Sequence, residues 1–281
     1  MFKIITPHLS VALHDPADGF YQGTRFDRGG VFDSLIFDGM ELAGRWFDRY
    51  DPFMHDAVCG PAEEFSPVFK DCGAVKIGVG LLKVPDASVY DHFKLYEVAD
   101  PGTWTCFQDE GSVTFRHILE GIYEYEKVIA LTGENSFEIR HRLRSGTDLQ
   151  GEVYNHNFFT FDNMSVGPWR KIDLPFRPEG TWRSVYDSVG FTDSGIRFSR
   201  KLEKGESVFS GDVHAPGGGM PYNVTFLEGP VSVNVRSDAL CTHSVFWSNY
   251  RVACLEPYNA FSSAPGKDFS WTLQYNFKYL F

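Results

Sequence analysis

One histidine in an aromatic, strand-forming run is the side chain best placed to move protons. His156 lies within Val153–Phe159, between two asparagines. Alternate side chains of a β-strand point to opposite faces, so Tyr154, His156 and Phe158 are expected to share one face. An imidazole has an ordinary pKa of about 6.5, so it can act as a proton donor or acceptor beside these aromatic side chains. The alternative is a buried, hydrogen-bonded structural histidine.

A second candidate, Glu256, follows the apolar stretch Val252–Leu255 and precedes Pro257. Because proline cannot donate to a strand ladder, this order predicts that a strand ends at Glu256. Burial of the carboxyl group would raise its pKa, whereas a hydrogen bond or a nearby cation would keep it ionised. His156 and Glu256 together make a candidate acid/base pair, expected to face one cleft.

The elements that must position this pair are predicted to be strands. The 281 residues include 26 Phe and 13 Tyr, residue types that favour strands over helices. From Trp104 to Leu149 successive runs alternate apolar and polar residues, as in an antiparallel sheet with one solvent-exposed face. This pattern predicts that His117 and His141 lie on the solvent side. We expect an all-β fold, a large antiparallel β-sandwich, with residues 1–281 forming a single domain.

Charge and cysteine content narrow the classes of partner. A formal net charge of −11 argues against nucleic acid or an anionic membrane and favours a neutral small molecule. No apolar run approaches the roughly 20 residues of a membrane span, and the N-terminus lacks an apolar signal core, so a cytoplasmic location is expected. The five cysteines are odd in number, scattered along the chain and without a Cys-x-x-Cys pair, which predicts reduced core residues and no zinc site. They are Cys59, Cys72, Cys106, Cys241 and Cys254.

Several polar side chains are candidates for holding a ligand. Arg28 lies beside glycines in residues 21–44, which are expected to form two short strands ending in a hairpin at Asp38-Gly39, although a solvated turn arginine is the alternative. Glu63 and Glu64 lie in residues 45–72, where neither a strand nor a helix period holds, as in a long loop.

Lys76 is a lone lysine in the apolar strand expected over residues 74–82, so it must extend to solvent or find a carboxylate. Glu63 or Glu64 is its expected partner, and we hypothesise that the pair lines the cleft. Asn155 beside the histidine is a further candidate for contacting the ligand. Trp247 offers a ring that could stack on a sugar, with core packing as the alternative.

These motifs resemble those of the galactose mutarotase-like (aldose 1-epimerase) superfamily. Residues 154–159 are similar to its Asn-His-x-x-Phe motif, which implies that His156 is the catalytic acid. Residues 252–257 are similar to the C-terminal motif that ends in the general-base glutamate, which implies that role for Glu256. The hairpin at residues 29–39 and the closing segment 265–277 are also similar, so the resemblance runs across nearly the whole chain. It implies a large β-sandwich of the galactose mutarotase-like supersandwich type.

Two positions depart from the family pattern. Glu63-Glu64 stands where the family has Asn-Arg, and Val75-Lys76 stands in the segment where it carries a second histidine. The resemblance therefore implies an altered substrate contact set beside a retained acid/base pair.

The implied reaction opens and recloses a sugar hemiacetal, with a base taking the C1 hydroxyl proton while an acid protonates the ring oxygen. One carboxylate and one imidazole suffice, so no metal or organic cofactor is expected, and the expected partner is a small-molecule sugar. Two alternatives stay open: a non-catalytic carbohydrate-binding protein, and another proton-transfer enzyme acting on a sugar on the same scaffold.

Overall fold

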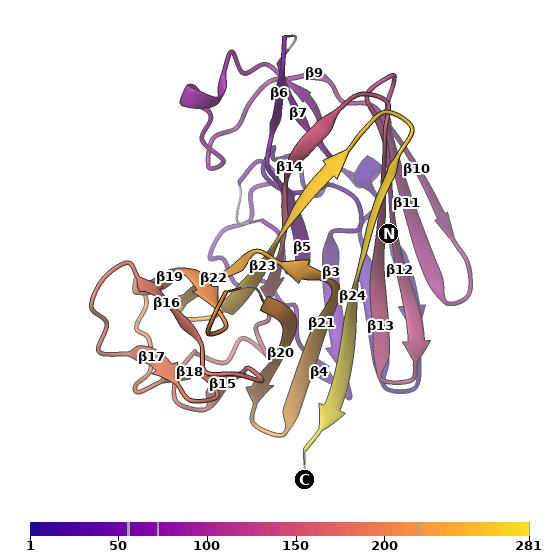
Figure 1. Cartoon of the computed structure of the whole chain (residues 1–281). Helices are drawn as coiled ribbons and strands as arrows, with labels where there is room; N and C mark the ends of the chain where they lie inside the picture. Colours follow the sequence, from indigo (N-terminus) through magenta and orange to yellow (C-terminus); the bar gives the residue numbers. More distant parts are fainter. Residues whose placement is uncertain (55–56, 72, 219, 281) are drawn as a thin grey trace.

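The regular secondary structure of the chain consists almost entirely of antiparallel strands (Figure 1). The computed structural model describes residues 1–54, 57–71, 73–218 and 220–280; Cys72 lies outside them, so the prediction made for it is not addressed. Two short 3-10 helices, η1 (Pro16–Asp18) and η2 (Ala87–Val89), are the helical elements of the described residues. None of the helices found there is long and apolar enough to cross a membrane.

Two large sheets make up most of the molecule. The ten-stranded sheet has the order β10 (Thr103–Gln108), β11 (Ser112–Leu119), β12 (Tyr123–Gly133), β13 (Ser136–Ser145), β24 (Asp268–Tyr279), β21 (Val231–Cys241), β20 (Met220–Glu228), β15 (Arg170–Asp173), β18 (Gly195–Phe198) and β17 (Val189–Thr192). The six-stranded sheet has the order β16 (Glu179–Trp182), β19 (Ser207–His214), β22 (His243–Asn249), β23 (Ala253–Ser263), β14 (Leu149–Phe158) and β5 (Gly60–Phe65).

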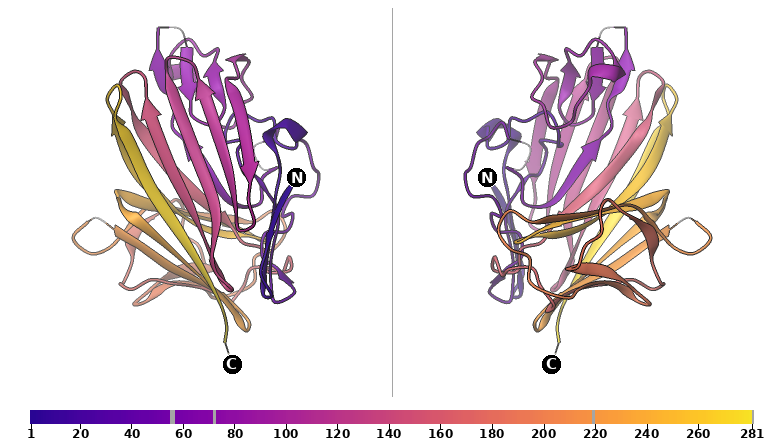
Figure 2. Two further views of the ribbon diagram at one scale, coloured as in Figure 1. Left: turned by 90° about the vertical axis from the view of Figure 1, so that its right-hand side faces the viewer. Right: turned by 90° about the vertical axis from the view of Figure 1, so that its left-hand side faces the viewer.

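Two four-stranded sheets complete the fold. One contains β1 (Phe2–Ile5), β2 (Leu9–Leu13), β3 (Phe32–Phe37) and β4 (Met40–Glu41), and the other contains β6 (Val68–Lys70), β7 (Gly73–Lys76), β8 (Gly80–Leu82) and β9 (Val98–Asp100). In the left view of Figure 2 the first of them, in indigo, lies at the right beside the magenta strands of the ten-stranded sheet, where β1 contacts β11.

The two large sheets pack face to face, as the expected sandwich requires. Their alternating apolar side chains form one large cluster that includes Phe115, Phe137 and Phe226 of the ten-stranded sheet and Phe246 and Leu255 of the six-stranded sheet. Burial of this apolar surface is the main driving force for the packing. The all-β antiparallel architecture predicted from the sequence is therefore confirmed.

Some local predictions were wrong. His117 and His141 are buried, because each points inward to a tyrosine hydroxyl that contacts its Nδ1 at 2.9 Å. Residues 45–72 are not one long loop, since β5 and β6 lie within them. No strand precedes the hairpin between residues 21 and 31, although the Asp38-Gly39 turn itself is confirmed, with both residues at positive φ.

Candidate active site

A break between two neighbouring strands creates the place where His156 and Glu256 meet. Strand β14 pairs with β23 from Leu149↔Ser263 to Tyr154↔Tyr258, and the two strands meet again only at the bridge Phe159↔Ala253. Pro257 lies in the break and has no N–H to donate to β14. The predicted strand end at Glu256 was wrong, because β23 runs on through Pro257 while keeping its pairing with β22.

Side chains replace the missing ladder bonds. The backbone N–H of Asn157 donates to Cys254 Sγ at 3.0 Å, and the Tyr222 hydroxyl donates to the Leu255 carbonyl at 2.6 Å. Buried backbone groups are thus partnered while the strands stay apart. The separation leaves room for the side chains of His156 and Glu256 between the two strands.

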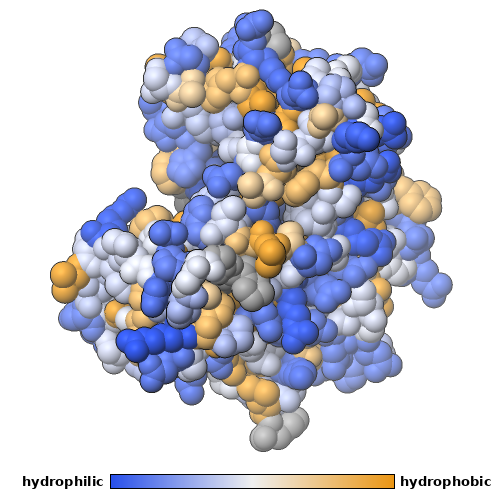
Figure 3. All heavy atoms as spheres, viewed as in Figure 1, coloured by the Kyte–Doolittle hydropathy of each residue, from blue (hydrophilic) through white to orange (hydrophobic). Residues whose placement is uncertain are grey.

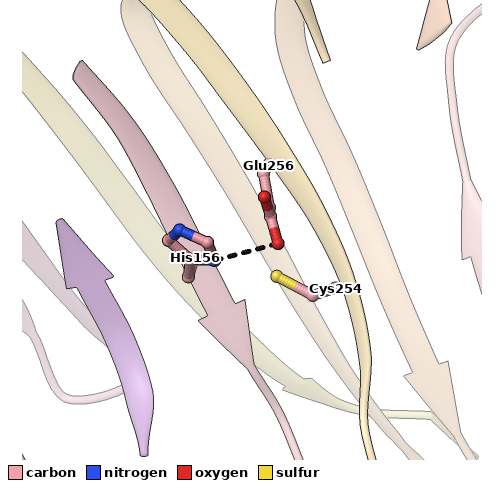
Figure 4. Close-up of side chains that lie close together, drawn as sticks. All are labelled: His156, Cys254 and Glu256. Atoms are coloured by element: carbon pink, nitrogen blue, oxygen red, sulfur yellow. Dashed lines mark ion pairs between the residues drawn. The ribbon is translucent and has the colours of Figure 1, made fainter. Parts of the chain in front are cut away.

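The His156 ring is held between two carboxylates. Its Nδ1 lies 2.9 Å from Glu256 Oε1, and its Nε2 lies 3.3 Å from Glu64 Oε2 (Figure 4 shows the first contact). Neither contact has the angle of a hydrogen bond, so both are ion-pair contacts. Burial alone would lower the pKa of His156, but Glu256 and then Glu64 raise it above its ordinary value. The arrangement favours a protonated imidazolium, which can act as an acid.

Glu64 is the counter-charge shared by several cations. Its Oε2 accepts a hydrogen bond from Arg25 Nε at 2.5 Å, its Oε1 contacts His92 Nδ1 at 3.1 Å, and Lys76 Nζ lies 3.8 Å away. Burial would raise the pKa of Glu64, but Arg25 and Lys76 hold it well below its ordinary value. Burial lowers the pKa of Lys76 to about 8, outweighing the opposite effect of Glu64. Near pH 7 this cluster therefore holds an ionised carboxylate.

The pair opens into a cavity of about 360 Å³. This volume is near the lower end of the range of about 300–1,000 Å³ for small-molecule sites. The outline in Figure 3 is hollowed on its left side, between the upper part with β6–β9 and the lobe with β16–β19. Aromatic rings dominate the lining, and a few polar groups join them. The lining residues are Arg25, Phe26, Trp46, His92, Phe93, His156, Phe158, Arg183, Phe209, Val245, Trp247, Glu256 and Tyr258. Such a lining suits a compact ligand with both apolar and hydroxyl faces.

Cys254 adds a third donor beside the pair. The ligand atoms of His156, Cys254 and Glu256 lie within 4.8 Å of one another (Figure 4). Imidazole, thiolate and carboxylate can together hold zinc. Burial raises the pKa of Cys254 well above its ordinary value, however, and the cation Arg25 lines the same cavity. We therefore interpret the group as an ion pair of His156 and Glu256 beside a neutral thiol.

Glu63 and Asn155 face away from this cavity. Adjacent residues of a strand point to opposite faces, so Glu63 lies in the core between the sheets while Glu64 faces the site. There Glu63 accepts a hydrogen bond from Asn155 Nδ2 at 3.0 Å and forms an ion pair with Lys127, which also pairs with Asp27 at 2.6 Å. The expectation that Glu63 and Asn155 contact the ligand does not fit this placement.

We expect Lys127→Met to destabilise the fold strongly. Burial would lower the pKa of Lys127, but Asp27 and Glu63 raise it above its ordinary value, so the lysine is charged between these two carboxylates. The variant would leave both carboxylates buried without that charge. Leaving buried charges uncompensated costs about 3–5 kcal/mol. Urea denaturation measures the loss. Arg142→Met is the control, because Arg142 forms an exposed pair with Asp268 whose loss should cost about 1 kcal/mol or less. A loss in Lys127→Met as small as in the control would contradict this role.

The remaining sequence candidates divide between the cavity and the surrounding structure. Trp247 lines the cavity as expected. Arg28 does not line the cavity; it donates instead to the backbone carbonyls of Gln22 and Gly23 and so holds a loop in place. Lys76 pairs with Glu64, one of the two partners expected from the sequence. It is fully buried, however, and donates a hydrogen bond to the Phe65 carbonyl behind the site. The hypothesis that this pair lines the cleft is not met.

Arg25, His92 and Arg183 were not selected from the sequence as ligand contacts, yet all three line the cavity. Each lies outside a regular strand, where no period marks a residue's direction. The one available signal is that polar and aromatic residues of loops concentrate at binding sites. That signal does not separate these three residues from the other loop residues.

Comparison with known proteins supports the fold through structure alone. No family model and no curated protein matches the sequence. Solved structures do match over nearly their whole length. A proposed aldose 1-epimerase of Escherichia coli K12 matches with a TM-score of 0.61 at 11% identity, over 99% of this chain and 99% of that chain. A GalM/aldose epimerase homologue of C. elegans matches with a TM-score of 0.57 at 13% identity, over 100% and 99%.

A galactose 1-epimerase from Lactobacillus acidophilus matches with a TM-score of 0.54 at 10% identity, over 98% of this chain and 92% of that chain. Similarity at this level of identity establishes the architecture and not the reaction. The chain has the galactose mutarotase-like fold. The superfamily resemblance seen in the motifs around His156 and Glu256 is thus confirmed at the level of the fold.

Proposed function

We propose that this protein is a carbohydrate epimerase that opens and recloses the hemiacetal of an aldose. The observation that carries the proposal is the buried contact of 2.9 Å between His156 and Glu256 at the wall of an aromatic cavity. An acid and a base in contact with each other suit a substrate whose two reacting oxygens are bonded to the same carbon. The ring oxygen and the C1 hydroxyl of an aldose meet that condition.

In this mechanism the two residues have separate roles. His156, kept protonated by its two carboxylate neighbours, donates a proton to the ring oxygen as the bond between C1 and the ring oxygen breaks. Glu256 accepts the C1 hydroxyl proton; a carboxylate has two oxygens, so one can stay near His156 while the other faces the substrate. The open aldehyde rotates about C1–C2, and the reverse transfers close the ring on the other face. Both residues then regain their starting protonation states.

The buried charges favour an enzyme over a non-catalytic sugar-binding protein. Burying a charged imidazole and two carboxylates is costly, and a binding site for neutral hydroxyls does not require it. Perturbed titratable groups in a cleft are typical of catalytic sites. The aromatic rings Trp46 and Trp247, in contact at 5.6 Å, offer apolar surface for the carbon face of a sugar ring.

Activity should decline on the alkaline side as His156 loses its proton. Since the pKa of His156 is raised, its acid form persists above pH 6.5, and the alkaline limb of kcat/KM is expected above that value. Polarimetry of freshly dissolved α-anomers, followed against pH and corrected for the spontaneous rate, measures the limb. A limb below pH 6.5 would argue against His156 as the acid.

The same assay tests the proposed reaction when applied to a panel of aldoses. Acceleration of mutarotation for at least one sugar is the expected result. Tight sugar binding without acceleration would instead support a non-catalytic binding protein on this fold.

A further inference from the structure

Arg183 differs from the other charged groups of the cavity in lacking a counter-charge. It follows β16, lines the cavity and is exposed. Its guanidinium lies over the Phe209 ring, 4.4 Å from the ring centroid. Within the described part of the chain, no ion pair or side-chain hydrogen bond holds this guanidinium. By contrast, Arg25 is bound to Glu64 at 2.5 Å. The five N–H donors of Arg183 therefore remain available to a ligand.

The charges of the site favour a negative ligand. Among the described residues, the ion pairs of the site join three cationic groups, Arg25, Lys76 and the protonated His156, to two carboxylates, Glu64 and Glu256. Arg183 adds a further positive charge at the cavity wall. This excess is local, because the whole chain carries a formal net charge of −11. A cleft with an excess of positive charge attracts anionic ligands.

The strand register places Arg183 at a distance from the acid/base pair. Phe209, beneath the guanidinium, is paired with Trp247, and Trp247 is paired with Cys254, two residues before Glu256. Two strand spacings of about 4.8 Å separate the Phe209 and Cys254 backbones, a distance on the order of 10 Å. Arg183 and Glu256 line different parts of the same cavity, so a sugar with its anomeric carbon at Glu256 has room to place its far end near Arg183.

We propose that the substrate is an aldose carrying an anionic group at the end away from its anomeric carbon, and that Arg183 binds this group. The inference rests on the proposed function and names its substrate class. A planar guanidinium binds phosphate, sulfonate or carboxylate through paired N–H donors. Arg183 acts in recognition and touches no reacting atom. Its loss should raise KM for anionic sugars more than it lowers kcat.

Isothermal titration calorimetry and mutarotation assays on matched sugars test this assignment. Glucose is compared with glucose 6-phosphate, glucuronate and 6-deoxy-6-sulfoglucose, which separates the three anionic groups. For wild type we expect at least tenfold tighter binding of one anionic sugar than of glucose. Arg183→Gln should reduce that ratio at least tenfold, and Arg183→Lys should reduce it partially, because the charge remains without the fork.

Arg177→Gln is the matched control. Arg177 lies in the same lobe, is exposed, pairs with Asp193 at 3.6 Å and does not line the cavity, so its variant should keep the wild-type ratio. Thermal denaturation checks that each variant folds. Equal affinity for neutral and anionic sugars, or a preference that survives Arg183→Gln, would overturn the proposal.

The two proposals fail in different ways. Binding with the expected preference but no mutarotation would refute the epimerase and leave the role of Arg183 standing. Mutarotation of neutral sugars without preference for anionic ones would refute the role of Arg183 and leave the epimerase standing.

Discussion

Glu256→Gln is expected to lower the rate of anomer exchange by about 10²–10⁴-fold, the usual range for loss of a general acid or base. The amide keeps the shape of the side chain but cannot accept the C1 hydroxyl proton. It also removes a negative charge 2.9 Å from His156, so the acid loses the neighbour that most raises its pKa. Exchange rates and sugar affinity are measured on the same preparation.

Sugar binding and folding should survive this substitution, since the amide preserves the packing. Glu152→Gln on β14 is the control: Glu152 is partly exposed and does not line the cavity, so its variant should exchange anomers at the wild-type rate. Unchanged exchange in Glu256→Gln would remove Glu256 as the base. Loss of both binding and folding would instead give Glu256 a structural role.

Glu64→Gln is expected to cost about 3–5 kcal/mol of folding free energy, because it leaves buried cations without their counter-charge. Arg25 and Lys76 both pair with this carboxylate, and the Lys76 side chain is only 1% exposed. The variant should also move the alkaline limb of activity to lower pH, since Glu64 helps to raise the pKa of His156. Chemical denaturation and the pH profile read the two effects separately.

Glu97→Gln is the control for stability, because Glu97 forms an exposed pair with Lys83 and its loss should cost about 1 kcal/mol or less. A double-mutant cycle sharpens the assignment. Lys76→Met should couple with Glu64→Gln by about 0.5–3 kcal/mol and be nearly additive with Glu63→Gln, which faces the core. Additivity in both cycles would show that neither carboxylate is the partner of Lys76.

The strand that carries His156 was predictable because its residues show the strand pattern by themselves. Aromatic and apolar side chains dominate Val153–Phe159, and the structure contains β14 there. Strand β5 was missed because Gly-Pro-Ala-Glu-Glu-Phe shows no such pattern. Both glutamates are buried beside cations: Lys76, the partner expected from the sequence, and Arg25 lie against Glu64, and Lys127 lies against Glu63. The residues around the two glutamates do not indicate that Arg25 and Lys127, which are remote in the sequence, pair with them.

Pro257 shows how a correct local rule led to a wrong strand boundary. Proline does remove a ladder bond, but β23 has neighbours on both sides, and the bond is lost on the β14 side alone. The strand continues, and the loss opens the break that contains the site. Arg183 could not be placed at all, because its position depends on how the lobe with β16–β19 folds over the cavity.

The most direct test of the central claim is saturation-transfer NMR on equilibrated aldoses with catalytic amounts of the wild-type protein. Saturating the anomeric proton of one anomer should diminish the signal of the other far beyond the transfer seen without protein, for at least one neutral or anionic sugar. The effect should disappear when Glu256→Gln replaces the wild type. Sugars that bind the cavity while showing no transfer above the spontaneous rate would contradict the account of His156 and Glu256 as an acid/base pair for hemiacetal opening.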